Sequence, residues 1–177
     1  KCGSSQQAVH FAHQGIAAGA YDIVIACGVE SMSRVPMGIS RIDQNPYGPS
    51  FLERYAPGLI GQGVCAERVA AKWQISREAM DAYSARSHAR ADDARKAGYF
   101  AKEIVPIQTP TGTAEQDETI RAGTTAEKLA DLKPSFRNDE LHARFPEIEW
   151  SVTAGNASQI SDGASAVLMM SEETALR

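Results

Sequence analysis

At the start of the chain, a helical pattern of hydrophobic and polar positions gives way to a continuous apolar run. Apolar side chains recur at helical spacing in SSQQAVHFAHQGIAAGA, which predicts a helix from about Ser4 to Ala18. Residues 21–29, YDIVIACGV, are apolar without alternation and rich in β-branched side chains, a pattern typical of a strand covered on both faces. Together these elements indicate part of an α/β sheet layer.

The pattern changes after Ser31. Proline, glycine and asparagine crowd the stretch that ends at Gly63, which predicts a long loop or excursion rather than sheet. Helical periodicity returns over residues 64–74 and again over 76–97, where Ser76 is a good N-cap and the last turn is basic.

The rest of the chain alternates short elements with polar segments. EIVPIQT predicts a strand, TTAEKLADLKPSF predicts a short helix with a threonine cap, and residues 137–150 predict irregular structure. From Ser151 onward we expect a strand, a Gly-Asn turn into a helix of small residues, and a strand over SAVLMMS. The predicted fold class is therefore α/β, with sheet-layer parts at 1–31 and 151–177 and a mainly helical excursion at 32–150.

Composition and charge narrow the function classes. The 177 residues are 43% hydrophobic and 23% charged, with a net charge of -4 and no Lys/Arg run suited to a phosphate backbone, so we expect no nucleic-acid partner. No apolar stretch approaches the ~20 residues of a membrane-spanning helix, so we expect no membrane partner. The cysteines, Cys2, Cys27 and Cys65, lack metal-like spacing. We therefore expect no metal site, no disulfide framework and a cytoplasmic location.

Cys2 stands directly before the first predicted helix, in KCGSS. Unpaired N–H groups and the helix dipole at such a place stabilise a thiolate, which lowers the pKa of a cysteine and makes it nucleophilic. Gly3 lets the backbone bend and a substrate approach. The residues alone leave two interpretations open, a catalytic nucleophile or a small buried hydrophobic side chain. Cys27, in the apolar strand, and Cys65, on a helix, are expected to be core residues.

Three segments carry a family resemblance that decides between these interpretations. KCGSSQQA, AGAYDIVIACGVESMS and VTAGNASQISDGASAVLMMSE resemble the thiolases, that is, acetyl-CoA acetyltransferases and 3-ketoacyl-CoA thiolases. The resemblance implies the thiolase fold, here as the later part of the N-terminal βαβαβαββ half with its inserted loop domain at 32–150. It also implies that Cys2 is the nucleophile that holds the acyl group as a thioester.

Other motifs of the family do not occur in this chain. In thiolases, a histidine of Gly-His-Pro activates the nucleophile, a second cysteine of Cys-x-Gly-Gly-Gly acts as acid and base, and an asparagine of Asn-Glu-Ala-Phe orders a water. The chain also begins without methionine and closes on EETALR, which resembles a helix just starting. We therefore expect a fragment that lacks the start of the first half and the whole second half, and that does not run the full reaction alone.

The resemblance further implies a coenzyme A site around IRAGTTAEKLADLKPSF. A guanidinium suits the charged nucleotide end, and apolar walls with a few polar anchors suit the pantetheine arm. For Leu132 and Phe136, an ordinary helix core face is an equally good interpretation. The matching positions are Arg121, Lys128, Leu132, Phe136, Ala157 and Ser158.

Two departures bear on the acyl chain. Where short-chain biosynthetic thiolases have a His-Met pair, this chain has Gly61 and Gln62, which implies a roomier acyl pocket. The stretches NPYGPSFLERYAPG and NDELHARFPEIEW resemble thiolases that degrade bulky acyl chains, including steroid side chains.

The implied reaction is thiolysis of a 3-ketoacyl-CoA to acetyl-CoA and a shortened acyl-CoA, reversible by Claisen condensation, with coenzyme A as a substrate and no cofactor. The expected partners are acyl-CoA, coenzyme A and further copies of the chain, as a dimer or tetramer, of which we expect the homotetramer. Two alternatives stay open. One is a non-catalytic acyl-CoA binding module of the same fold, in which Cys2 is inert. The other is a decarboxylating condensing enzyme of the superfamily, loaded from acyl carrier protein.

Overall fold

A computed structural model describes residues 3–42 and 44–177 of the chain. Contacts divide the chain into two compact units. The sheet unit runs up to Pro46 and resumes at Ile160–Arg177, and the helical unit is Tyr47–Gln159. The functional division at 31/32 and 150/151, which separates a thiolase core from a loop domain, stays a prediction.

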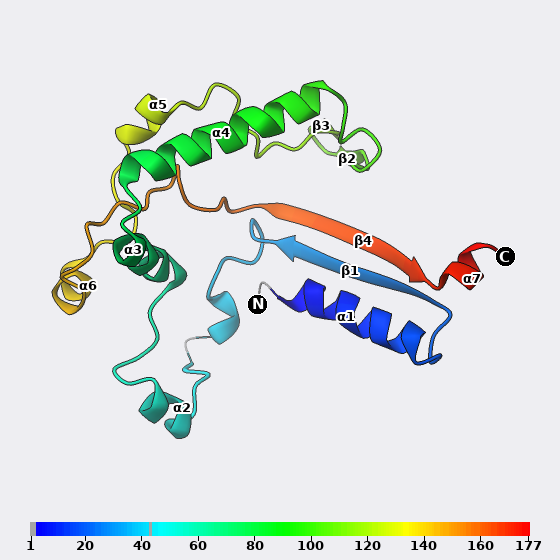
Figure 1. Cartoon of the computed structure of the whole chain (residues 1–177), viewed down its shortest axis with the longest axis horizontal. Helices are drawn as coiled ribbons and strands as arrows, with labels where there is room; N and C mark the ends of the chain where they lie inside the picture. Colours follow the sequence, from blue (N-terminus) through cyan, green and yellow to red (C-terminus); the bar gives the residue numbers. More distant parts are fainter. Residues whose placement is uncertain (1–2, 43) are drawn as a thin grey trace. The chain divides into compact units, whose positions relative to one another are not determined.

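The sheet unit is an antiparallel strand pair with a helix against it (Figure 1). The strands pair from Ile23 opposite Met170 to Ser31 opposite Asp162. The predicted helix over 4–18 and the predicted strand over 21–29 are thereby confirmed, with ends shifted by one or two residues. The elements are α1 (Ser4–Ala17), β1 (Ile23–Ser31), a 3-10 helix η1 (Ile39–Arg41), β4 (Asp162–Met170) and α7 (Glu172–Ala175).

Alternation along the strands separates two faces of this sheet. Ala26 of β1 is buried on the side that meets α1, and Ala12 of that helix is buried as well. Ile25 and its partner Leu168 lie on the opposite face and are 64% and 60% exposed. Cys27 shares this face and is exposed. For the described residues, the expectation of a strand covered on both faces with Cys27 in a core is therefore wrong, because α1 covers one side only.

The helical unit has its longest helices in the predicted places. α3 (Gln62–Trp73) and α4 (Arg77–Lys96) confirm the helices predicted over 64–74 and 76–97. The hydroxyl of Ser76 caps α4 by accepting a hydrogen bond from the N–H of Ala79 at 3.2 Å. The shorter elements are α2 (Pro49–Arg54), β2 (Ile107–Thr109), β3 (Gly112–Ala114), α5 (Ala126–Ala130) and α6 (Asp139–Arg144).

Two stretches differ from the prediction. Residues 137–150, expected to be irregular, contain α6, because the Asn138 side chain caps its start by accepting from the N–H of Leu141 at 2.8 Å. Residues 151–161, expected to form a strand and a helix, form neither in the structure, apart from an isolated bridge between Pro134 and Thr153. The side chain of Asn156 binds the local main chain instead, which favours a turn over a helix.

The apolar core of the helical unit joins α3 to the residues that precede Ser151. Val64, Phe145, Ile148 and Trp150 form a buried cluster. Trp150 has a φ of 55°, in the left-handed region that non-glycine residues rarely adopt. Its indole N–H donates to Nδ1 of His142 at 3.1 Å, so the buried ring keeps a hydrogen-bond partner.

In the described part of the chain, no helix is both long enough and apolar enough to span a membrane.

Candidate functional site

The predicted nucleophile, Cys2, lies outside the described residues. Its sequence neighbour Gly3 is the N-cap of α1, and the N–H of Gln7 donates to the carbonyl of Gly3 at 3.0 Å. The prediction that a helix starts beside Cys2 is thus confirmed by the start of α1 at Ser4. The role of the thiol itself stays a prediction.

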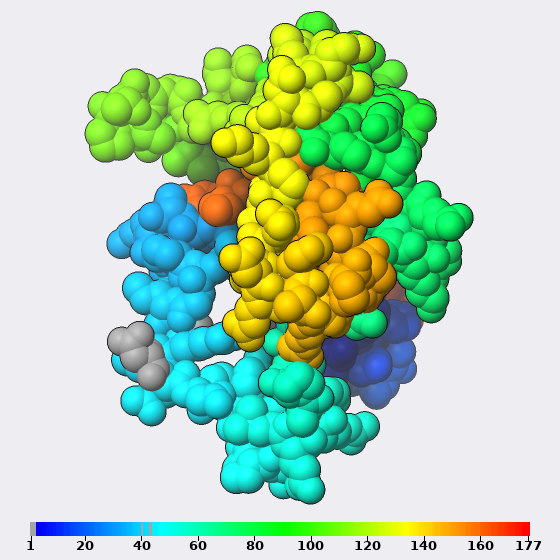
Figure 2. Space-filling view, turned by 90° about the vertical axis from the view of Figure 1, so that its left-hand side faces the viewer, coloured from blue at the N-terminus to red at the C-terminus, as the bar shows by residue number. Residues whose placement is uncertain are grey.

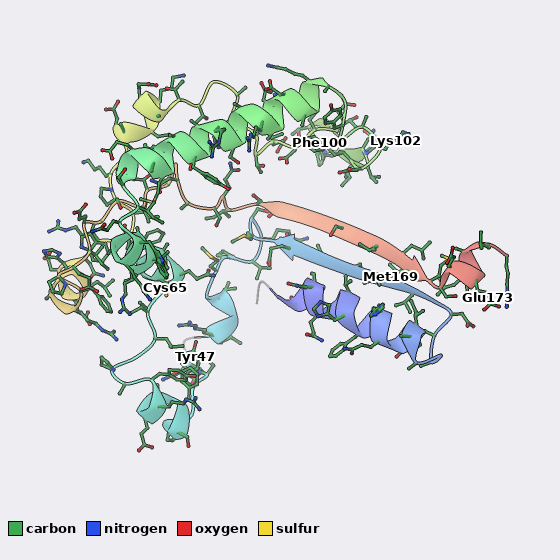
Figure 3. The ribbon with its side chains drawn as sticks, in the orientation of Figure 1. Tyr47, Cys65, Phe100, Lys102, Met169 and Glu173 are labelled. Atoms are coloured by element: carbon green, nitrogen blue, oxygen red, sulfur yellow. The ribbon has the colours of Figure 1, made fainter. Side chains whose placement is uncertain are left out.

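Cys65 lies on α3 (Figure 3), and its side chain is exposed. The helix buries the face that carries Val64, Glu67 and Ala70, and Cys65 stands one position away from that face. The expectation of a core cysteine is therefore wrong here, because an apolar neighbour in sequence does not place a residue on the buried side of a helix.

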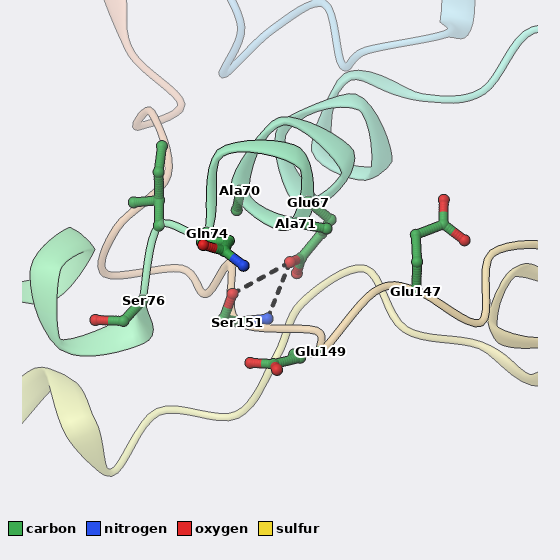
Figure 4. A pocket seen from close by; sticks show the side chains of 9 residues that line it. Glu67, Ala70, Ala71, Gln74, Ser76, Glu147, Glu149 and Ser151 are labelled. Atoms are coloured by element: carbon green, nitrogen blue, oxygen red, sulfur yellow. Dashed lines mark hydrogen bonds between the residues drawn. The ribbon is translucent and has the colours of Figure 1, made fainter.

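A buried carboxylate holds the start of a turn over residues 151–158, the Asn156 turn. Glu67 of α3 is 1% exposed. Its Oε1 accepts from the N–H of Val152 at 2.7 Å, and its Oε2 accepts from the N–H of Ser151 at 3.0 Å. Figure 4 shows this carboxylate directed at Ser151. Both residues line a pocket of about 320 Å³. Because both oxygens are occupied by main-chain donors, Glu67 acts as an anchor of the chain.

A second buried carboxylate holds the middle of the same turn. Asp81 of α4 is 2% exposed, and its Oδ1 accepts from Nδ2 of Asn156 at 2.9 Å. Its Oδ2 accepts from Nε of Arg77, one helical turn earlier, at 2.6 Å. The same guanidinium donates through Nη2 to the carbonyls of Leu129 and Leu132, at 2.5 and 3.0 Å. Arg77 and Asp81 therefore connect α5 with the Asn156 turn.

Two glycines allow the predicted coenzyme A residues to lie close to their neighbours. A Cβ atom on Gly155 would lie 2.6 Å from Cδ1 of Leu132, so the Asn156 turn contacts this leucine directly. A Cβ atom on Gly63 would lie 2.4 Å from the ring of Phe136, which places that ring against the start of α3. Leu132 and Phe136 are nevertheless 38% and 36% exposed, so part of each side chain remains accessible.

The structure thus brings some predicted site residues together and leaves others apart. Leu132 contacts the turn that contains half-buried Ala157 and exposed Ser158. Gly61 is the exposed N-cap of α3 and Gln62 is its exposed first residue, near Phe136 through Gly63. The main-chain N–H of Arg121 donates to Nδ1 of His88 at 3.2 Å, which places Arg121 beside α4.

The start of α5 is the charged part of this region. The pKa of the Glu127 carboxyl is held below its ordinary value because its own main-chain N–H and the hydroxyl of Thr125 donate to it. The ammonium of Lys128, a predicted coenzyme A-binding residue, donates to the carbonyl of Gly123 at 2.8 Å. Figure 2 shows the yellow segment that contains α5 against the green of α4, in agreement with their contacts.

Within residues 3–42 and 44–177, no three His, Cys, Asp or Glu side chains form a group that could hold a metal ion.

Sequence reasoning did not find Glu67, Arg77, Asp81 or Asn156. The available signal was an acid in the middle of an otherwise apolar helix face, since Glu67 lies three residues after Val64 and three before Ala70. A buried acid of this kind needs a partner, but no local pattern says where along the chain that partner lies.

Comparison with known proteins decides the family. The family described as "Thiolase, N-terminal domain" matches residues 1–173. The chain belongs to the thiolase family. The resemblance found in its motifs is thereby confirmed, as is a mixed helix and strand structure of the thiolase type.

This thiolase chain is 39% identical, over 180 residues, to the steroid 3-ketoacyl-CoA thiolase FadA6 of Mycobacterium tuberculosis, covering 97% of the chain and 41% of the relative. It is 40% identical, over 194 residues, to the peroxisomal 3-ketoacyl-CoA thiolase of Yarrowia lipolytica, covering 99% and 42%. It therefore spans less than half the length of these relatives.

Solved thiolase structures also resemble this chain. The dimeric peroxisomal thiolase of Saccharomyces cerevisiae has a TM-score of 0.78 at 35% identity, covering 96% of this chain and 41% of that structure. Human mitochondrial 3-ketoacyl-CoA thiolase, solved in complex with CoA, has a TM-score of 0.78 at 33% identity, covering 99% and 44%.

Proposed function

We propose that the protein to which this chain belongs cleaves 3-ketoacyl-CoA with coenzyme A, with Cys2 as the acyl carrier. The observation that carries the proposal is the position of Cys2, immediately before a helix start, in a chain that matches the thiolase N-terminal domain over residues 1–173. Relatives named as thiolases of 3-ketoacyl-CoA support the reaction class.

The proposed reaction has two steps. The Cys2 thiolate forms a C–S bond to the 3-keto carbon, the bond between C2 and C3 breaks, and acetyl-CoA leaves as an enolate that takes up a proton. The thiolate of incoming coenzyme A then attacks the thioester, releases the shortened acyl-CoA and restores the Cys2 thiolate. We expect the groups that move the protons to lie outside this chain, and we expect no metal or redox cofactor.

The test is acyl trapping on the purified full-length protein. Incubation with acetyl-CoA should add one acetyl group to the Cys2 peptide, and Cys2→Ser should lower kcat for thiolysis by more than about a thousandfold. Cys65→Ser is the matched control and should keep wild-type activity, because this thiol is exposed on α3. Iodoacetamide should label Cys2 first, and acyl-CoA should protect it. Acetylation or first labelling at Cys27 or Cys65 would contradict the proposal.

The same experiment separates the alternatives. An acyl-CoA binding module would bind acyl-CoA without acetylating Cys2 or releasing acetyl-CoA. A decarboxylating condensing enzyme would accept an acyl group from acyl carrier protein and would not cleave 3-ketoacyl-CoA with free coenzyme A.

For the acyl chain, we propose a bulky group, including steroid side chains. The support is that Gly61 contributes no side chain to the pocket and that one relative is named as a steroid 3-ketoacyl-CoA thiolase. Replacing Gly61 and Gln62 with His and Met should lower kcat/KM for a bulky substrate at least about tenfold more than for acetoacetyl-CoA. Equal losses on both substrates would contradict this choice.

We also propose that the protein is a cytoplasmic homo-oligomer, as a dimer or tetramer. The dimeric Saccharomyces cerevisiae thiolase supports self-association. Light scattering on the intact protein at micromolar concentration should give two or four times the subunit mass, and a monomer would contradict the proposal.

A further inference from the structure

One hydrogen-bond network, through Arg77 and Asp81, connects the Asn156 turn with the end of α5. Asp81 is nearly inaccessible, and both of its oxygens are used, one by Arg77 and one by Asn156. Among the described residues, no buried side-chain nitrogen or oxygen lacks a hydrogen bond, so this network is closed. Such a network holds its members in one arrangement, because breaking either bond to Asp81 leaves a buried carboxylate oxygen without that donor.

On the α5 side, the network ends on main-chain carbonyls. Nη2 of Arg77 lies 2.5 Å from the carbonyl oxygen of Leu129 and 3.0 Å from that of Leu132. The Leu129 carbonyl lies in the last turn of α5 and also accepts from the N–H of Leu132 at 3.0 Å, and Leu132 follows the last helical residue by two positions. The planar guanidinium donates to them and to Asp81 at the same time, whereas a lysine ammonium cannot span both sets from one position.

On the other side, the network fixes the shape of the turn. Oδ1 of Asn156 accepts from the N–H of Thr153 at 2.8 Å, and Nδ2 also donates to the carbonyl of Ser151 at 3.1 Å. Gly155 then lies directly against Leu132. A shift of α5 would therefore be transmitted to Ala157 and Ser158 through both packing and hydrogen bonds.

We propose that Arg77 and Asp81 are positioning residues that hold Leu132 and the Ala157–Ser158 segment together as one binding surface for coenzyme A. This inference rests on the proposed function. It assigns to these residues an action through the ligand-contacting segments and no contact with the reacting atoms.

The experiment compares Arg77→Lys and Asp81→Asn with Asp92→Asn in the full-length protein. Asp92 is a matched control, since it is also a buried acid on α4, but its ion pairs with Arg95 and Lys96 stay within that helix. Both test variants should raise KM for coenzyme A by about tenfold while kcat stays within about twofold. Asp92→Asn should leave KM unchanged.

A second measurement does not depend on coenzyme A. In Arg77→Lys, amide hydrogen exchange should increase together in residues 129–132 and 153–158, and it should not do so in Asp92→Asn. Arg77→Lys keeps a cation beside Asp81 but removes the planar guanidinium. It therefore tests the simultaneous donation to Asp81 and the carbonyls even where Asp81→Asn fails to fold. Combining Arg77→Lys with Leu132→Ala should give less than the product of the single effects on KM, because both act on the same surface.

The outcomes separate the two proposals. Unchanged KM together with unchanged exchange in Arg77→Lys would overturn the positioning role, as would equal losses of kcat and affinity in the test and control variants. If the wild-type protein does not bind coenzyme A but Arg77→Lys still raises exchange in both segments, the link between α5 and the Asn156 turn is retained and the proposed function is overturned.

Discussion

Among the described residues of the sheet unit, the buried side chains are those of Ala12 and Ala26, while larger apolar side chains such as Ile25 and Leu168 stay exposed. The helical unit instead buries carboxylates, and it gives Glu67 and Asp81 main-chain and side-chain donors of their own. Buried carboxylate oxygens that all have hydrogen-bond donors indicate a unit that completes its own interior. An exposed apolar sheet face indicates that the stability of the sheet unit depends on whatever covers that face.

The largest effect should come from removing a buried anchor of the helical unit. Glu67→Ala leaves the N–H groups of Ser151 and Val152 without their acceptor, so we expect a loss of about 3 kcal/mol in the free energy of unfolding. Urea unfolding followed by circular dichroism measures this loss. Glu147→Ala, which removes a half-exposed carboxylate paired with Arg68 at 3.6 Å, should cost less than about 1 kcal/mol. Equal losses would mean that burial does not distinguish the two acids.

A smaller effect should separate the faces of the sheet. Ala26→Leu adds volume on the face that meets α1, where overpacking should cost about 1–3 kcal/mol. Ile25→Thr changes the opposite, exposed face and should cost less than about 1 kcal/mol in this chain. The same unfolding experiment compares them. A larger loss for Ile25→Thr would show that the exposed face is covered in solution.

The smallest effect should be a dependence on pH at the end of the sheet. The Ser33 hydroxyl and the main-chain N–H of Ser33 donate to Asp162, which holds the pKa of this carboxyl below its ordinary value of about 3.9. Because the folded pKa is lowered, the stabilisation is present above the unfolded pKa and is lost as the pH falls through the folded pKa. Hydrogen-exchange protection of β1 and β4, corrected for intrinsic rates, should therefore decrease in acid.

Ser33→Ala provides the control for this measurement. It removes the hydroxyl donor but keeps the N–H of Ser33, 2.8 Å from Oδ1 of Asp162, so the acid-induced loss should begin at a higher pH. An unchanged pH profile would show that the hydroxyl does not set the pKa of Asp162.

Much of the local structure followed from the sequence because its causes are local. Ser76 and the periodicity after it determine where α4 starts. For α1 and α3 the periodicity alone was the signal, because their N-caps, Gly3 and Gly61, make no side-chain hydrogen bond. The missed helix α6 had an equally local signal, an asparagine cap followed by Asp139 and Glu140. Its short length and polar composition hid that signal.

The candidate site was less predictable because its contacts are distant along the chain. Glu67 and Val152 are separated by 85 positions, and Asp81 and Asn156 by 75, so no spacing rule connects them. Burial of Cys27 and Cys65 was wrongly predicted for a related reason. An apolar neighbourhood in sequence does not reveal which side of an element receives a neighbour.

The burial of Trp150 makes tryptophan fluorescence a probe of the helical unit. The chain has two tryptophans, and Trp73 is 60% exposed whereas Trp150 is 5% exposed and bonded to His142. A shielded indole emits at shorter wavelength than one in water, so Trp73→Phe would leave an emission spectrum dominated by the residue directly before the Asn156 turn. Loosening of that turn would then be visible as a red shift, without any attached label.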